Sequence, residues 1–173
     1  LKSPDLTNME EAARKVAVFE DKAIFYGLDD ACIEGLFNAS QQYSIELPIQ
    51  NPTDLLTTLT QVKLHFTQWG IEGPYALVAG PVLWSRIYSL GEIYPLHKKI
   101  SDILEGGKVV FSPNVNDGIV VSLRGGDFEL ILGKDISIGY KEHKEGTVSL
   151  YFTETFTFNI VTPEAAVPLK LVD

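Results

Sequence analysis

The chain has 173 residues, 45% of them apolar and 21% charged, which suits one globular domain or a domain with a second lobe. Its 14 basic and 23 acidic residues give a net charge of −9, which argues against a surface that binds duplex nucleic acid. One cysteine and three histidines at unrelated spacings exclude an intrachain disulfide and predict no metal site. No apolar run reaches the ~18 residues of a membrane span, and no signal peptide is present, so we expect a cytoplasmic protein.

The charge is unevenly distributed along the chain. Residues 1–50 carry 4 basic and 9 acidic residues, residues 51–108 carry 5 of each, and residues 109–173 carry 5 and 9. A neutral middle between acidic flanks predicts two lobes, with the middle segment inserted into the rest.

A long helix is predicted over residues 8–26. Thr7 and Glu10 have the spacing of a capping box, in which each side chain satisfies one free backbone donor of the first turn. Apolar residues then recur every three or four positions, which places them on one face, and Gly27 provides the stop. Residues 28–46 are predicted to be a loop with short extended pieces.

The middle of the chain is predicted to be mostly helical. Asn51, Pro52 and Asp54 mark the start of a second helix, whose apolar stripe runs from Leu55 to Trp69 before Gly70 ends it. The pattern further predicts a buried strand over 75–79, helices over 81–90 and 95–105, and a strand over 108–112.

The last third of the chain is predicted to be strands. Residues 118–123 and 127–132 flank Arg124-Gly125-Gly126, which suggests a hairpin turn, and residues 135–140 continue as extended chain. Residues 148–161 alternate strictly, so the even positions should form a dry face interrupted only by Glu154. A strand of 14 residues would span roughly 46 Å, which predicts a bend at Glu154 or an elongated domain of the kind found in assemblies.

The residues show no catalytic constellation. Cys32 could act as a nucleophile only if His65 or His97 came beside it, and a small buried side chain is the simpler interpretation. The aromatic residues lie on apolar stripes and are predicted to belong to the core. The pattern alone therefore favours a non-enzymatic α+β protein of two lobes that works in an assembly.

Five segments of the sequence are distinctive: V-F-E-D-K-A-I-F-Y-G at 18–27, G-I-E-G-P-Y-A-L-V at 70–78, R-G-G-D-F at 124–128, G-K-D-I-S-I-G-Y at 133–140 and T-E-T-F-T-F at 153–158. These segments resemble the encapsulins, the shell proteins of bacterial and archaeal nanocompartments, and among them the virus-like particle shells of hyperthermophilic archaea. They follow one another in the family's order over nearly the whole chain.

The resemblance implies the fold of tailed-phage capsid proteins of the Hong Kong 97 type. Residues 1–30 would hold the spine helix of the peripheral domain, residues 31–118 the axial domain, and residues 119–173 the peripheral strands. The family's amino-terminal arm, first helix and extended loop have no counterpart in this sequence, which begins just before the spine helix. Since that loop would supply flavin contacts, we expect no cofactor in these residues.

The resemblance also implies two sites. One is a loop that lines the pore at the five-fold axis, where copies of Glu92 would form a carboxylate ring that attracts cations; its residues are Ser89, Leu90, Gly91, Glu92, Ile93 and Tyr94. The other is an inner-wall groove at Asp135, Ile136 and Ile138, where the targeting peptide of a cargo protein would dock. No catalytic and no metal-binding residue is implied.

The function implied is that of a self-assembling shell subunit that forms an icosahedral particle from pentameric units. Its cargo would be an iron-storage or oxidative-stress protein, held by a targeting peptide or as a fused ferritin-like domain. Neither nucleic acid nor a membrane is needed. The alternatives are a capsid protein of a virus or defective prophage, a cysteine-dependent hydrolase that uses Cys32, and a monomeric peptide-binding module.

Overall fold

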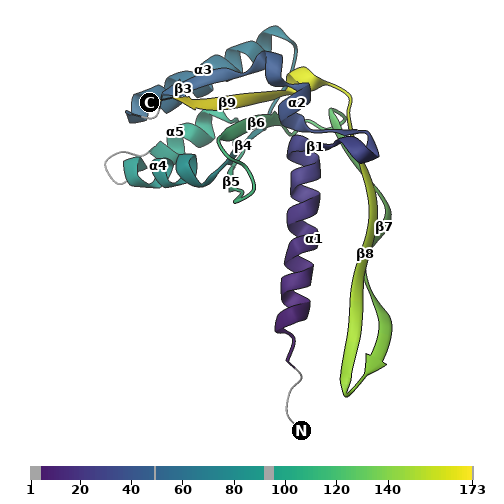
Figure 1. Ribbon diagram of the computed structural model, residues 1–173. Helices are drawn as coiled ribbons and strands as arrows, with labels where there is room; N and C mark the ends of the chain where they lie inside the picture. The colour runs from purple at the N-terminus through teal and green to yellow at the C-terminus, as the bar shows by residue number, and fades with distance from the viewer. Residues whose placement is uncertain (1–4, 49, 92–95, 173) are drawn as a thin grey trace. The chain divides into compact units, whose positions relative to one another are not determined.

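The computed structural model describes residues 5–48, 50–91 and 96–172, and it divides the chain into two compact units (Figure 1). The first unit comprises Leu1–Gly35 and Glu129–Asn159, and the second comprises Leu36–Phe128 and Ile160–Asp173. The chain therefore leaves the first unit, builds the second, and passes through each once more before it ends.

The first unit begins with the long helix α1, Thr7–Tyr26. The predicted capping box is wrong, because the carboxylate of Asp5 accepts hydrogen bonds from the backbone N–H of Thr7 at 3.0 Å and from its hydroxyl at 2.7 Å. The helix ends as expected at Gly27, which has φ 90° and donates its N–H to the carbonyl of Ala23. A Cβ at Gly27 would lie 2.7 Å from the carbonyl oxygen of Ile33, so only glycine fits there.

Two strand pairs complete the first unit. The short strands β1, Gly27–Leu28, and β2, Ile33–Glu34, pair antiparallel around the 3-10 turn η1, Asp29–Ala31. The long strands β7, Phe128–Lys144, and β8, Thr147–Ile160, form a separate two-stranded sheet. The positive φ angles of Glu145 and Gly146, 48° and 78°, allow the tight connection between them.

The expected dry face of β8 is only partly dry. Phe158 is buried, whereas Val148 and Leu150 near the turn are 52% and 46% exposed. The alternation assigned these side chains to one face correctly, but no described part of the chain covers that face near the turn.

The second unit is built on a five-stranded sheet in the order β3-β9-β6-β4-β5. The outer pairs β3–β9 and β4–β5 are parallel, and the inner pairs β9–β6 and β6–β4 are antiparallel. The strands are β3 Ile45–Pro48, β4 Tyr75–Ala79, β5 Val109–Phe111, β6 Gly118–Ser122 and β9 Ala166–Val172. The shorter elements are α2 Leu36–Ala39, η2 Gln41–Tyr43 and η3 Pro163–Ala165.

Three helices pack with this sheet into a single core. They are α3 Pro52–Gln68, α4 Pro81–Gly91 and α5 Leu96–Ile103. As expected, the backbone N–H of Asn51 donates to the carboxylate of Asp54 at the start of α3, at 3.0 Å. Phe66 of α3, Ile87 of α4 and Ile100 of α5 are at most 1% exposed and join one cluster with the strand residues.

Three predictions need correction. Residues 124–126 do not form a hairpin, since β6 pairs with β4 and β9 while β7 pairs with β8. Trp69, predicted on the apolar stripe of α3, is 39% exposed. The expected division at 31–118 and 119–173 also differs from the observed units, because β6 and β9 lie in the same sheet as β4.

Candidate functional site

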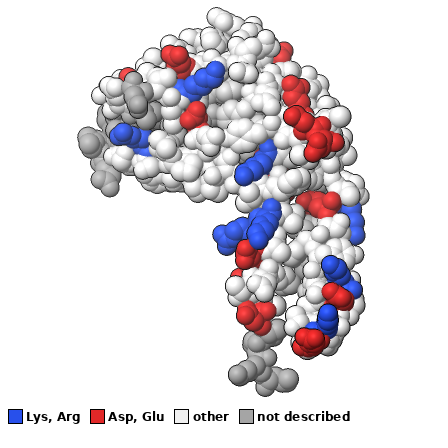
Figure 2. All heavy atoms as spheres, viewed as in Figure 1, with Lys and Arg blue, Asp and Glu red and all other residues white. Residues whose placement is uncertain are grey.

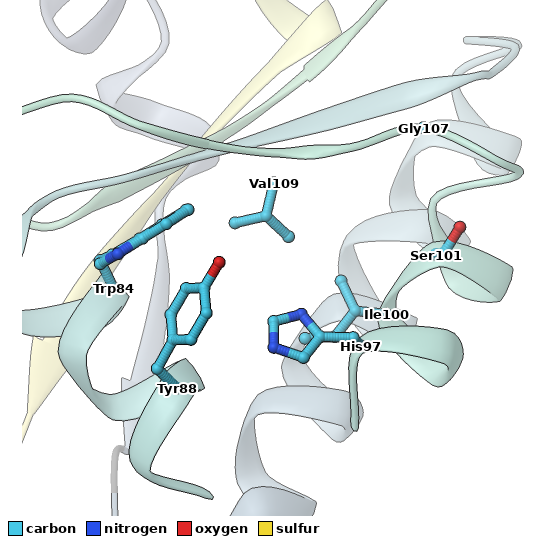
Figure 3. A pocket seen from close by; sticks show the side chains of 7 residues that line it. All are labelled: Trp84, Tyr88, His97, Ile100, Ser101, Gly107 and Val109. Atoms are coloured by element: carbon cyan, nitrogen blue, oxygen red, sulfur yellow. The ribbon is translucent and has the colours of Figure 1, made fainter. Parts of the chain in front are cut away.

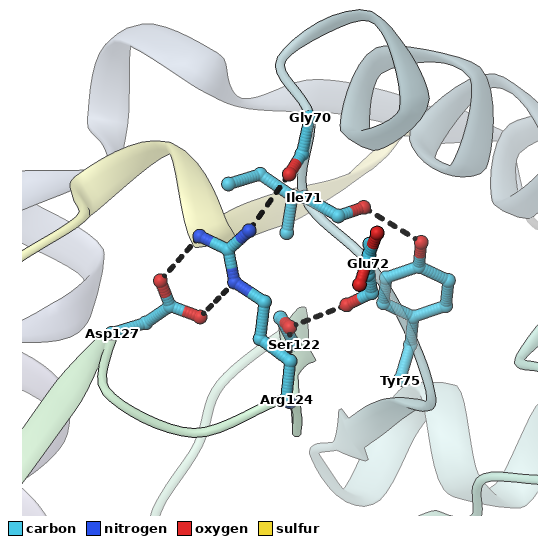
Figure 4. A network of polar contacts seen from close by, with 7 residues as sticks. All are labelled: Gly70, Ile71, Glu72, Tyr75, Ser122, Arg124 and Asp127. Carbon is cyan, nitrogen blue, oxygen red and sulfur yellow. Dashed lines mark hydrogen bonds and ion pairs between the residues drawn. The ribbon is translucent and has the colours of Figure 1, made fainter.

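An ion pair between exposed Arg124 and buried Asp127 belongs to a hydrogen-bond network that joins the R-G-G-D segment to the segment after α3 (Figure 4). The guanidinium of Arg124 donates two hydrogen bonds to the carboxylate of Asp127, from Nε at 2.9 Å and from Nη2 at 2.7 Å. Its third nitrogen, Nη1, donates to the carbonyl of Gly70 at 2.7 Å. Arg124 of the R-G-G-D turn therefore forms a hydrogen bond with the backbone just after the carboxyl end of α3, where carbonyl groups lack helical hydrogen-bond partners.

Two hydroxyl groups beside this pair are also hydrogen-bonded. Ser122 donates its hydroxyl to the carbonyl of Glu72 at 2.8 Å, and Tyr75 donates to the carbonyl of Ile71 at 2.9 Å. The hydrogen bonds from Arg124 hold the pKa of Asp127 below its ordinary value of 3.8. Burial raises the pKa of Tyr75 above 10.0. Each of these side chains already forms a hydrogen bond with a carboxylate or a backbone carbonyl. The network therefore holds the backbone in place, and none of its named groups is an unpaired base or nucleophile.

A second cluster lies between α4, α5 and β5 and forms an aromatic pocket (Figure 3). The ring of Trp84 lies 4.7 Å from that of Tyr88 and 5.4 Å from that of Phe111, and Tyr88 lies 5.1 Å from His97. The pocket has a volume of about 140 Å³, and the residues that line it are Trp84, Tyr88, His97, Ile100, Ser101, Gly107 and Val109.

The aromatic pocket corrects the prediction that the aromatic residues belong to the core. Tyr88 is 50% exposed and Phe111 is 44% exposed, although each packs against a neighbouring ring. The spacing of four residues between Trp84 and Tyr88 was the available signal, because it places both rings on one face of a helix. The contribution of Phe111 from a distant strand had no signal in the sequence.

The predicted pore loop lies largely outside the described residues. Ser89 is exposed in the last turn of α4, and its hydroxyl donates to the carbonyl of Arg86 at 3.1 Å. Leu90 and Gly91 belong to the end of the same helix. Glu92, Ile93 and Tyr94 fall in the range that is not described, so the carboxylate ring stays a prediction.

The predicted groove residues lie on β7 in the first unit. Ile136 and Ile138 are 45% and 54% exposed, so they are not core residues. Because successive strand residues point to opposite faces, these two share one face and Asp135 lies on the other. The carboxylate of Asp135 accepts the N–H of Ile136 at 2.7 Å.

Carboxylates of the first unit gather around Glu20. Partial burial, together with the negative charges of Glu154, Asp21 and Asp135, raises the pKa of Glu20 above 4.5. The described residues hold no group of three side chains suited to a metal ion, so this acidic cluster is an electrostatic feature of the first unit.

A surface hollow of about 690 Å³ also lies in the first unit, between the start of α1 and the turn end of β8. Met9 and Ala12 line it from the helix, and Leu150 and Phe152 line it from the strand. It exposes apolar side chains from two elements side by side, which is a feature of surfaces that bind other chains.

Cys32 is exposed in the first unit at φ 54°, which corrects the interpretation of this residue as a small buried side chain. His65 and His97 belong to the second unit. His65 packs against Trp69 with ring centroids 5.3 Å apart. No helix in the described part of the chain is long and apolar enough to cross a membrane.

Solved structures define the class of protein. A virus-like particle protein from Pyrococcus furiosus matches with a TM-score of 0.65 and 16% identity over 88% of this chain and 63% of that chain. A cyanophage capsid protein matches with a TM-score of 0.65 and 10% identity over 99% of this chain and 68% of that chain. The chain therefore has the capsid fold of tailed phages, as the sequence predicted.

Sequence relatives define the family. The family model described as encapsulating protein for peroxidase matches residues 1–157. The type 1 encapsulin shell protein of Rhodospirillum rubrum is 37% identical over 96% of this chain, and that of Mycolicibacterium paratuberculosis is 39% identical over 95%. The chain belongs to the encapsulin family, and it spans 59% and 62% of the length of these two relatives.

Proposed function

We propose that this chain is the structural part of a shell subunit that assembles with its own copies into an encapsulin nanocompartment in the cytoplasm. Family membership supports this role, and one feature of the structure carries it: the first unit leaves much of its apolar surface uncovered. In this proposal the chain is a structural component of the shell, and it has no catalytic function of its own.

The uncovered surface is concentrated on the β7–β8 hairpin, with Phe19 exposed on α1. Eleven large apolar side chains of the first unit are 42% or more exposed: Leu6, Phe19, Leu130, Ile131, Leu132, Ile136, Ile138, Tyr140, Val148, Leu150 and Tyr151. Exposed apolar side chains in this number on one hairpin are typical of surfaces that bind other chains. In a shell, neighbouring copies would cover it.

The strand edges of the hairpin add to this argument. Among the described residues β7 pairs only with β8, so each strand has one free edge with backbone groups that can still form hydrogen bonds. Such an edge is available for pairing with another chain.

The cargo in this proposal is a protein of iron storage or oxidative-stress defence. The family description names a peroxidase as the encapsulated protein, which supports the oxidative-stress class. The cargo would be held by a targeting peptide or as a fused ferritin-like domain. Ile136 and Ile138 present two apolar side chains on one face of β7, which suits a peptide with Leu or Ile anchors. Asp135, the third residue of the proposed groove, lies on the opposite face of the strand.

The groove can be tested with one matched control. A peptide of the cargo's carboxy-terminal sequence should bind the assembled shell, and the double replacement of Ile136 and Ile138 by Ser should weaken binding at least about tenfold. Ile131→Ser removes a side chain that is 51% exposed from the other face of the same strand and should leave binding unchanged. Equal loss in both variants would contradict the groove.

The pore is proposed at residues 89–94, in pentameric units. Glu92→Gln would remove one negative charge per copy and should slow the entry of ferrous iron into the shell. Iron uptake at the same rate in the variant and the unchanged protein would contradict a carboxylate ring.

The particle itself is tested by its mass in solution. Light scattering with negative-stain imaging of the full-length protein should show hollow particles in the megadalton range. A monomer would contradict the proposed function. A viral or prophage capsid is the second candidate, because the cyanophage match is as good as the particle match. Terminase or portal genes beside this gene would favour the virus, and cargo genes would favour the compartment.

A further inference from the structure

The two strands of the β7–β8 hairpin have different lengths. β7 has 17 residues and β8 has 14, and the tight connection at Glu145 and Gly146 joins them at one end. At the other end, the backbone N–H of Val161 donates to the carbonyl of Asp127 at 2.9 Å. Because the hairpin is closed at both ends, three residues of β7 have no counterpart in β8. Extra residues in one strand of a pair form β-bulges, which disrupt the ladder locally and are common beside functional sites.

Two of the extra residues fall in one short segment. Gly133 faces Thr155, since a Cβ there would lie 2.9 Å from the hydroxyl oxygen of that residue, and both lie six positions from the hydrogen bond at the base of the hairpin. The next contact joins the hydroxyl of Ser137 to the carbonyl of Thr153 at 3.5 Å. It lies four positions further along β7 but only two further along β8. Residues 133–137 therefore form a bulge, the β7 bulge.

Asp135 supplies a hydrogen bond inside the β7 bulge. Its carboxylate accepts the backbone N–H of Ile136 at 2.7 Å, so this donor has an acceptor outside the ladder with β8. Ile136 is the first of the two isoleucines of the proposed groove, and Ile138 follows two positions later. Because a bulge bends its strand and increases the local twist, the backbone of the β7 bulge sets the direction in which both isoleucines point.

The charge of β7 does not favour the attraction of a basic peptide. The strand carries three acidic and three basic residues, which are Glu129, Asp135 and Glu142, and Lys134, Lys141 and Lys144. Figure 2 shows acidic and basic side chains interspersed along the hairpin, at the lower right of the face drawn there. Exposed ion pairs contribute little in water, and Asp135 has a lysine beside it in sequence. The acceptor oxygen of Asp135, rather than its charge, is therefore its distinctive contribution to the groove.

We propose that Asp135 is a positioning residue of the groove: its acceptor oxygen holds the β7 bulge, and the bulge presents Ile136 and Ile138 together to the cargo peptide. The negative charge of Asp135 makes no contact with the peptide in this role. Gly133 allows the close approach of Thr155 at the start of the bulge. This inference rests on the proposed function of the groove and assigns the part that Asp135 plays in it.

Two variants of one residue separate the role of the oxygen from that of the charge. Asp135→Asn keeps an acceptor oxygen and loses the charge, whereas Asp135→Ala loses both. The probe is the carboxy-terminal peptide of the cargo protein encoded beside this gene, titrated into assembled shells of the full-length protein. Asp135→Asn should bind it within about twofold of the unchanged protein, and Asp135→Ala should bind it about three- to tenfold more weakly. The loss in Asp135→Ala should be the same at low and high salt.

The opposite outcomes can be told apart. Equal losses in both variants would overturn the positioning role, and losses that shrink at high salt would identify a charge contact with the peptide instead. Unchanged binding in both variants would overturn it as well. No binding by the unchanged shell would overturn the groove, and with it this inference, without affecting the particle. Glu129→Gln and Glu129→Ala are the matched controls and should bind normally, since Glu129 is exposed on β7 outside the bulge.

Deletion of the bulge gives a second readout. Removal of Lys134 and Asp135 brings the two strands into step up to Ser137, and the alternation of faces is kept because the number removed is even. Circular dichroism and particle mass should stay unchanged, but peptide binding should fall at least about tenfold. In the dissociated subunit, the amide of Ile136 should exchange its hydrogen several-fold faster in Asp135→Ala than in Asp135→Asn. Full peptide binding by the deletion variant, or equal exchange in the two substitution variants, would contradict the proposal.

Discussion

The two units differ in how completely each buries its own apolar side chains. Of the 26 apolar residues buried among the described residues, 23 lie in the second unit and only Ala23, Ile33 and Phe158 lie in the first. Of the 18 large apolar side chains that are exposed, 11 lie in the first unit. The second unit therefore has the core of an independent domain, whereas the first resembles a part that is completed by neighbouring chains.

The physical reason lies in the elements of each unit. A five-stranded sheet with three helices encloses side chains between layers, so one continuous core forms. A single helix and a two-stranded hairpin cannot enclose much, because isolated two-stranded sheets are only marginally stable in water. Phe19 and Phe156 illustrate this limit: their rings meet edge to face at 6.5 Å, yet Phe19 remains 51% exposed.

The largest expected effect distinguishes the two units directly. Phe66→Ala empties a site that is 0% exposed in the second unit and should lower the free energy of unfolding by about 3–5 kcal/mol. Phe19→Ala in the first unit should lower that of the dissociated subunit by less than ~1 kcal/mol, but it should weaken the assembled particle. Chemical denaturation of each variant, as subunit and as particle, measures both effects. An equal loss of unfolding free energy in the dissociated Phe66→Ala and Phe19→Ala subunits would contradict the difference between the two units.

The next effect concerns the ion pair that stabilises the second unit. Arg124→Ala leaves the carboxylate of Asp127, which is 2% exposed, without its cationic partner, and should lower the free energy of unfolding by about 1–3 kcal/mol. Arg86→Ala removes an exposed guanidinium from α4 and should change the free energy of unfolding by less than ~0.5 kcal/mol. Urea unfolding of the two variants gives the comparison.

The same pair predicts a dependence on acid. The pKa of Asp127 is lowered in the folded state, so its contribution is fully present above 3.8 and is lost as the pH falls below that value towards the folded pKa. Unfolding curves between pH 5 and 2 should show this loss in the unchanged protein. The loss should be smaller in Arg124→Ala, and an identical acid response in both would remove the ion pair as its cause.

The smallest expected effect lies in the acidic cluster of the first unit. The pKa of Glu20 is raised in the folded state, so its ionisation opposes folding at neutral pH, and this penalty disappears as the pH falls through the folded pKa towards 4.5. Glu20→Gln should therefore raise the melting temperature slightly at pH 7 and leave it unchanged at pH 4. Glu11→Gln, at an exposed position paired with Lys15, is the control and should not stabilise the protein. A Glu20→Gln variant less stable than the parent at pH 7 would contradict this account.

The local sequence determined the helices and several strands of this protein. Strand β4 begins and ends where the apolar run predicted, and α1 and α3 follow their apolar stripes to within a few residues. These elements are set by interactions between residues close in sequence, such as helical periodicity and the glycine at the end of α1. The resemblance of local segments also identified the fold and the family correctly.

The tertiary structure alone decided how the strands pair and which faces are covered. The sequence predicted no strand at β9, which contains Pro168 and does not alternate, yet it lies between β3 and β6 because both neighbours offer free backbone edges there. The glycines after Arg124 suggested a hairpin turn. Instead, the guanidinium of Arg124 binds the nearby carboxylate of Asp127 and the carbonyl of Gly70, which is 54 residues away in sequence. The ring of Trp84, which lines the aromatic pocket, likewise meets the ring of Phe111 from a separate strand. The sequence by itself determined what depends on near neighbours, and contacts between distant segments decided the rest because their partners are brought together only by the fold.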